Sequence, residues 1–129
     1  MAFNILIVDD SPIMRQVIKK TVRISGVSIG EIYEANHGYE GLEKAKNHWI
    51  DLILSDINMP EMDGLTFIKE LKKDEVLSSI PVVVISTEGR DQVVQQALSS
   101  GAADYITKPF RPEEIGRDVL KVLGYDIKQ

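Results

Sequence analysis

Residues 52–60, which decide the fold, read Leu52-Ile53-Leu54-Ser55-Asp56-Ile57-Asn58-Met59-Pro60. The mostly apolar run ends at a carboxylate, Asp56, and a turn follows at once. A short continuous run of this kind is typical of a strand buried on both faces of a parallel sheet. Asp56 would then lie at the carboxyl end of the strand, the edge at which open α/β sheets place their ligand sites.

The rest of the chain alternates strands with helices. Apolar runs at 5–8 and 82–85 predict two more buried strands, 103–106 predicts a short one, and the more polar segment 28–34 predicts an edge strand. Helices are expected from Ser11-Pro12 to about Gly26, after the turn at His37-Gly38, around 65–71, at 91–100 and from Pro112. Five strand–helix units with short loops predict an α/β fold with a doubly wound five-stranded parallel sheet, as a single domain over residues 1–129.

Helical periodicity also predicts which side chains face the core. In the order of the helices, the expected inward residues are Ile13, Met14, Val17, Ile18, Thr21 and Val22; Leu42, Ala45 and Trp49; Leu65, Ile68 and Leu71, with Phe67 beside them; Val93, Val94, Ala97 and Leu98; and Ile115, Val119 and Val122.

Composition limits the function classes. The chain has 129 residues, of which 43% are hydrophobic and 27% charged, as in an ordinary globular domain. A formal net charge of -5 argues against direct binding of nucleic acid, whose phosphates need basic patches. The absence of Cys excludes disulfides and thiolate chemistry. We see no signal-peptide pattern and no apolar run near the ~20 residues that span a bilayer, so we expect a cytoplasmic protein without membrane insertion.

Four predicted strands end in polar residues that suit one chemistry, and their ends share one edge of the sheet. These residues are Asp9 and Asp10, Asp56, Ser86 and Lys108. Three carboxylates in one pocket repel one another, and Mg²⁺, which takes oxygen ligands, would relieve that repulsion. We expect Asp10 and Asp56 to bind the metal directly and Asp9 to act through water.

With its charge balanced, Asp56 is a candidate nucleophile for a phosphoryl group, which it would hold as an aspartyl phosphate. Lys108 would supply a cation for the phosphoryl oxygens and Ser86 a hydroxyl hydrogen bond. Taken singly, each residue has a simpler interpretation: Asp10-Ser11-Pro12 makes a good helix N-cap and Asp56 a good turn residue. The hypothesis depends on finding all of them at strand ends.

These motifs resemble the receiver domain of bacterial response regulators. The resemblance is carried by Val8-Asp9-Asp10-Ser11, Asp56-Ile57-Asn58-Met59-Pro60-Glu61-Met62-Asp63-Gly64, Ser86 and Lys108-Pro109-Phe110, and it covers essentially the whole chain. It implies the CheY-like, flavodoxin-like strand order 2-1-3-4-5. It also implies a phosphorylation-activated switch of a two-component phosphorelay, which catalyses its own phosphorylation and dephosphorylation and is otherwise not an enzyme.

The resemblance assigns a role to each residue of the site. Asp56 is the phosphoacceptor for a phosphohistidine of a sensor histidine kinase, and the backbone carbonyl of Asn58 completes the Mg²⁺ site of Asp9, Asp10 and Asp56. Ser86 is the switch hydroxyl and Tyr105 the switch aromatic, and the Lys108–Pro109 peptide is cis. Asn58 and Glu88 occupy the positions that tune dephosphorylation, and this pair resembles chemotaxis-type regulators.

The implied output surface comprises the fourth helix, fifth strand and fifth helix. Its candidate exposed residues are Arg90, Gln95, Gln96, Tyr105 and Lys121. We expect a downstream protein partner there, with the flagellar motor switch as one candidate, and a phosphatase as a further partner. The alternative is a receiver domain cut from a longer regulator with a DNA-binding or enzymatic output domain.

Three rival interpretations use the same topology. A Mg²⁺-dependent phosphatase of the haloacid dehalogenase type needs a second Asp two residues after the nucleophile, where this chain has Asn58. A flavodoxin-like FMN binder needs a first loop rich in Ser, Thr and Gly, where this chain has Asp9-Asp10. A purely structural or dimerisation module has no need of the acidic residues.

Overall fold

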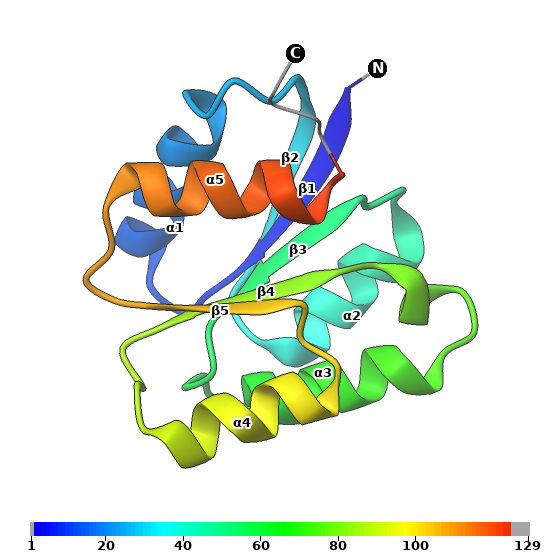
Figure 1. The fold of residues 1–129 in the computed structure, drawn as a ribbon. Coiled ribbons are helices and arrows are strands. Elements are labelled where there is room, and N and C mark those ends of the chain that lie inside the picture. The colour runs from blue at the N-terminus through cyan, green and yellow to red at the C-terminus, as the bar shows by residue number, and fades with distance from the viewer. Residues whose placement is uncertain (1, 125–129) are drawn as a thin grey trace.

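Five parallel strands form one sheet in the order β2-β1-β3-β4-β5 in the computed structural model, which describes residues 2–124 (Figure 1). The strands are β1 (Phe3–Val8), β2 (Ile29–Ala35), β3 (Leu52–Ser55), β4 (Val82–Ser86) and β5 (Asp104–Thr107). The predicted α/β class, the parallel sheet and the implied strand order are confirmed. Strand β2 lies at an edge, as its polar sequence indicated.

Helices cover both faces of this sheet. They are α1 (Pro12–Arg23), α2 (Gly38–Asn47), α3 (Gly64–Lys73), α4 (Asp91–Ser100) and α5 (Pro112–Val122). Figure 1 shows α1 and α5 on one face and α2, α3 and α4 on the other. A short 3-10 helix, Leu77–Ser79, precedes β4 and was not predicted. Within residues 2–124, no helix is long and apolar enough to cross a bilayer.

Alternate residues of the central strands build two separate cores. Leu6 and Val8 of β1 pack with Phe67, Ile68 and other residues on the α2, α3 and α4 side. Ile5 and Ile7 pack with residues of α1 and α5 on the opposite side. Because the central strands are covered on both faces, their sequences read as continuous apolar runs.

Several residues that periodicity placed inside lie at the surface. Ile13 is 79% exposed and Val17 43%, since α1 contacts the sheet and α5 along a narrower stripe than the six predicted positions. Trp49 is 80% exposed because α2 ends at Asn47, before the helix could carry it inward. Leu98 of α4 is also exposed, whereas Ala97 is fully buried. Phe67, placed beside the stripe of α3, is a fully buried core residue.

The end of α1 and the start of α2 differ from the prediction. Helix α1 ends at Arg23, and Gly26, with φ +94, lies in the following turn. Helix α2 begins at Gly38, and its N-cap is His37, whose Nδ1 accepts a hydrogen bond from the Glu40 N–H at 3.3 Å. His37 therefore has a structural role that its sequence context did not indicate.

Candidate active site

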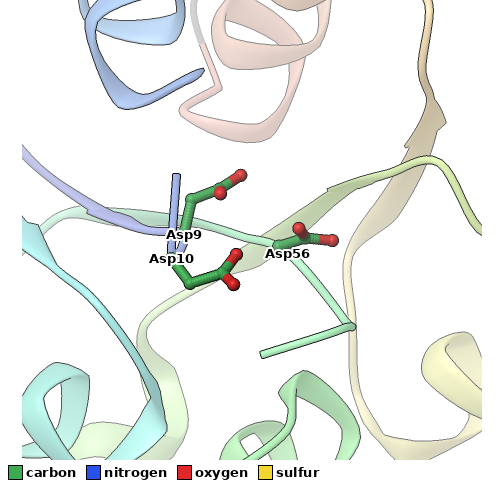
Figure 2. A group of neighbouring side chains, drawn as sticks. All are labelled: Asp9, Asp10 and Asp56. Atoms are coloured by element: carbon green, nitrogen blue, oxygen red, sulfur yellow. The ribbon is translucent and has the colours of Figure 1, made fainter. Parts of the chain in front are cut away.

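Three carboxylates meet at the carboxyl edge of the sheet. Val8 of β1 is paired with Ser55 of β3, so the residues that follow these strands lie side by side. One ligand oxygen from each of Asp9, Asp10 and Asp56 lies within 4.8 Å of the others (Figure 2). We call these three residues the acidic pocket. It brings together the residues that the sequence predicted, and its all-oxygen donor set suits a hard divalent cation.

Asp56 is fixed by the backbone around it. Its N–H donates to the Val8 carbonyl at 2.9 Å, which continues the β1–β3 pairing beyond the end of β3. Its Oδ1 accepts the Ile57 N–H at 2.6 Å, and its Oδ2 lies 3.5 Å from the Lys108 Nζ. The side chain is largely buried, yet it lies beside the exposed Asp10. Asp56 is thus held in place by the backbone and by Lys108, next to a solvent-exposed carboxylate.

Asp9 is the most buried member of the acidic pocket, at 1% exposure. Burial raises its pKa above the ordinary value, although the Ser11 N–H and the Lys108 ammonium oppose that shift. The Ser11 N–H donates to Asp9 Oδ1 at 2.9 Å, while the Ser11 hydroxyl accepts the Met14 N–H and caps α1. Ser11, and not Asp10, is therefore the N-cap, which leaves the Asp10 carboxylate available to the pocket.

Lys108 supplies the cation that the pocket needs. Its Nζ lies 3.2 Å from Asp9 Oδ2 and 3.5 Å from Asp56 Oδ2, and its side chain is 10% exposed. The Lys108 N–H donates to the Ser86 carbonyl at 2.7 Å, which anchors the start of the loop after β5. The following peptide, Lys108–Pro109, is cis, as the resemblance implied.

Ser86, Glu88 and Tyr105 form a second connected group next to the pocket. Ser86 is fully buried, and its Oγ accepts the Glu88 N–H at 3.1 Å. The Tyr105 hydroxyl donates to the Glu88 carbonyl. Tyr105 is therefore half-buried, not exposed as the list of output residues had it, and burial raises the pKa of its hydroxyl.

The remaining predictions concern the Glu88 side chain, Asn58 and the output surface. Glu88 pairs with Arg90 at 2.8 Å, and this hydrogen-bonded partner lowers the pKa of Glu88 to about 2. Asn58 is exposed in the loop after β3, and its backbone carbonyl as a metal ligand remains a prediction. Gln95, Gln96 and Lys121 are exposed, as expected for an output surface.

Two supporting residues were missed by sequence reasoning. The Arg15 Nη1 donates to the Asp9 carbonyl at 2.6 Å and so holds the backbone of the pocket from α1. Gly64 approaches Asp56 so closely that a Cβ at this position would lie 2.1 Å from the Asp56 carbonyl oxygen. The sequence placed Gly64 at the end of a motif but carried no signal of this contact.

Comparison with known proteins identifies the family. Residues 5–120 match the family model of the response regulator receiver domain, so the chain belongs to that family. Within the family it is CheY-like. It is 40% identical to the chemotaxis protein CheY1 of Helicobacter pylori, over 94% of this chain and 97% of that protein. It is 39% identical to the chemotaxis protein CheY of Bacillus subtilis, over 96% of this chain and 100% of that protein.

A solved structure has a similar fold. The CheX–CheY–BeF3–Mg²⁺ complex from Borrelia burgdorferi contains a chain that is 33% identical, with a TM-score of 0.84 over 93% of this chain and 88% of that one.

Proposed function

We propose that this protein is a phosphorylation-activated switch of chemotaxis signalling, with Asp56 as the residue that accepts the phosphoryl group. The observation that carries this proposal is the position of Asp56, within 4.8 Å of Asp9 and Asp10 and beside the Lys108 ammonium. The CheY proteins to which the chain is similar support the chemotaxis assignment.

The proposed transfer needs little beyond position and charge. A carboxylate oxygen of Asp56 attacks phosphorus while the bond from phosphorus to the donor's histidine nitrogen breaks, and the imidazole leaves. During the transfer, the Lys108 ammonium exchanges its contacts with the carboxylates for contacts with the negatively charged phosphoryl oxygens. The chain catalyses this transfer, and later the hydrolysis, only on itself, so it is not an enzyme with a separate substrate.

Asp9, Asp10 and Asp56, with the backbone carbonyl of Asn58, would hold Mg²⁺. The metal would neutralise charge on the acidic pocket and on the incoming phosphoryl oxygens. Asp9 is buried and paired with Lys108, while Asp10 is exposed to solvent and would be the more accessible carboxylate for a cation.

The proposed output is a rearrangement of the group next to the pocket. When the Ser86 hydroxyl turns to the phosphoryl group it gives up the Glu88 N–H, and the loop that carries the partner of the Tyr105 hydroxyl moves with it. Tyr105 then turns inward, and the surface of α4, β5 and α5 changes for a downstream protein. The flagellar motor switch is our candidate for that protein.

We further propose a cytoplasmic protein in which residues 1–129 form one receiver domain. A sensor histidine kinase is the phosphoryl donor, and a phosphatase is a further partner. The similar Borrelia CheY, which was solved in a complex with CheX, supports a second protein partner. The near-complete coverage of CheY1 and CheY supports the assignment of these residues to one receiver domain.

The first test is phosphorylation by a small donor. We expect acetyl phosphate with Mg²⁺ to add one phosphoryl group to the intact protein, seen by mass spectrometry, and EDTA to prevent it. Turnover of p-nitrophenyl phosphate by the same sample would instead favour the phosphatase interpretation, and bound FMN would favour the flavodoxin interpretation.

A change of Ile13 to Ser should separate protein donors from small ones. Ile13 is 79% exposed on the first turn of α1, directly after the acidic pocket, where a kinase must approach. Loss of this apolar contact is expected to slow transfer from a phosphorylated histidine kinase about 5-fold. Acetyl phosphate should label the variant at the wild-type rate.

The matched control is Ile24→Ser, which changes an exposed Ile just beyond the other end of α1. Equal kinase rates for both variants would contradict this docking.

A change of Lys108 to Arg should separate phosphorylation from its readout. The charge remains, but a planar guanidinium cannot occupy the space in which the ammonium contacts both Asp9 and Asp56. We expect labelling by acetyl phosphate to stay within several-fold of wild type. The beryllofluoride-induced shift of the Tyr105 ring signal in NMR spectra should be largely lost. A full Tyr105 response in Lys108→Arg would argue against Lys108 as the link.

A further inference from the structure

Two carboxylates away from the acidic pocket lie against each other on the surface of β5 and α5. Asp104 is the first residue of β5 and Asp118 lies in the middle of α5, and both line one pocket. Asp118 Oδ2 is buried and has no hydrogen-bond donor among residues 2–124. Two ionised carboxylates have only acceptors to offer, so a hydrogen bond between Asp104 and Asp118 requires a proton.

The surrounding charges do not replace that proton. Asp104 Oδ2 lies 3.4 Å from the Nζ of Lys121, whose side chain is 70% exposed, so solvent weakens this pair. Arg117, which is exposed, and Glu114 line the same pocket of about 340 Å³ together with Asp104, Asp118 and Tyr105. The charged and titratable groups around Asp118 are therefore Asp104 and Tyr105 from β5 and Glu114, Arg117 and Lys121 from α5.

Electrostatics favour unequal sharing of the proton. Burial and the neighbouring Asp104 raise the pKa of Asp118 to about 7. Burial also opposes ionisation of Asp104, but the Asp118 hydroxyl, the Tyr105 N–H and Lys121 together hold its pKa below the ordinary value. Below neutral pH the pair carries one negative charge, and above it two.

The pair is connected to the proposed switch aromatic. Asp104 Oδ1 accepts the Tyr105 N–H at 2.8 Å, and the Tyr105 hydroxyl reaches the Glu88 carbonyl in the loop after β4. A continuous path of contacts thus runs from α5 through β5 to that loop. A second charge on the pair would act at one end of this path.

We propose that Asp104 and Asp118 share a single proton that joins α5 to the strand of Tyr105, so that the β5–α5 surface responds to pH. The shared proton is argued from the buried, unpartnered Asp118 Oδ2 and from the pocket that both carboxylates line. Its consequence for signalling rests on the proposed function, in which this surface binds the downstream protein.

Linkage gives the sign of the effect on stability. The folded-state pKa of Asp118 lies above its value of 3.8 in the unfolded chain, so the folded protein binds more protons between these two pKa values. Stability contributed by the pair therefore falls as pH rises from about 4 to about 7, and stays constant above that range. Asp118→Asn, which retains a hydrogen-bond donor without a charge, should not show this fall.

The direct test is an NMR titration of the side-chain carboxyl carbons in the full-length protein. We expect one carbon of the pair to titrate near pH 7, and Asp118→Asn to abolish that transition while Glu43→Gln, an exposed acid on α2, leaves it unchanged. The amide signal of Tyr105 should shift with the same midpoint. Titration of both carboxyls below about pH 5 would overturn the proposal.

A second measurement keeps the proposal distinct from the proposed function. The melting temperature of Asp118→Asn relative to wild type should rise by about 3 °C between pH 5 and pH 7.5. A constant difference over that range would contradict the shared proton, whether or not Asp56 is ever phosphorylated. If the titration near pH 7 is found but acetyl phosphate labels nothing, the shared proton stands and the proposed function fails.

Discussion

Replacement of Asp56 by Asn is expected to lower phosphorylation by acetyl phosphate or phosphoramidate at least about 100-fold, to the background of the assay. The amide is nearly the same size as the carboxylate but is not a nucleophile, so the aspartyl phosphate cannot form. The measurement is the mass of the intact protein after incubation with donor and Mg²⁺, together with the acid stability and alkaline lability of the label.

The matched control is Asp63→Asn, in the same loop. Asp63 Oδ1 accepts the Thr66 N–H at 2.8 Å and caps α3, and Asn caps helices about as well as Asp. This variant should therefore be labelled like wild type. Undiminished labelling of Asp56→Asn would remove Asp56 from the proposed role, and loss of labelling in both variants would point to a disturbed loop instead of a missing nucleophile.

Local sequence was sufficient for the α/β class and for the residues at the strand ends, whereas the strand order came from the resemblance to receiver domains. The central strands are covered on both faces, so nearly all of their residues are apolar and their sequences are continuous apolar runs. Parallel strands bring their carboxyl ends to one edge, so Asp9, Asp56 and Lys108 could be placed together without knowledge of their distances. The 3.2 Å contact between Lys108 and Asp9 joins residues 99 positions apart and follows from that topology.

Periodicity was least informative about burial near helix ends and on partly covered helices. A helical stripe says that residues share a face, but the width of the covering surface decides how many of them are buried. Ile13 and Val17 lie outside the area that the sheet and α5 cover, and Trp49 follows the last turn of α2. An exposed residue such as Ile13 was thus predicted in the core, although we propose that it contacts a kinase at the start of α1.

Contacts that arise from the packing of two elements left no local pattern in the sequence. The Asp104–Asp118 pair and the approach of Gly64 to Asp56 each depend on how two elements pack. Gly64 shows the problem well, because its φ is not in the left-handed region, and the reason for Gly is the space occupied by another part of the chain. A turn motif alone cannot distinguish a glycine required by a left-handed backbone conformation from a glycine required by a close neighbour.

A change of Gly64 to Ala is expected to destabilise the protein by about 3 kcal/mol. The new Cβ would lie 2.1 Å from the Asp56 carbonyl oxygen and 2.8 Å from the Ile57 Cα, and these are backbone atoms that cannot rotate away. The loop after β3 must therefore move. The measurement is the midpoint of urea unfolding, with phosphorylation by acetyl phosphate measured on the folded fraction.

The control for this change is Gly116→Ala in α5, where the nearest atom to a new Cβ is the Ser25 Cβ at 3.3 Å. A small shift of one side chain suffices there, and Ala gains up to about 1 kcal/mol of helix propensity over Gly, so its net effect should lie within about 1 kcal/mol of zero.

The two readouts of Gly64→Ala also test how the site is held. The Gly64 N–H donates to the Ile57 carbonyl at 2.8 Å, while the Ile57 N–H donates to Asp56 Oδ1, so movement of the loop reaches the carboxylate through one residue. A displacement near 1 Å at a reacting group costs roughly 100-fold in rate, and we expect a loss of that order in the folded variant. A destabilised variant with the wild-type rate would instead mean that β3 and Lys108 alone position Asp56, and that the loop serves only stability.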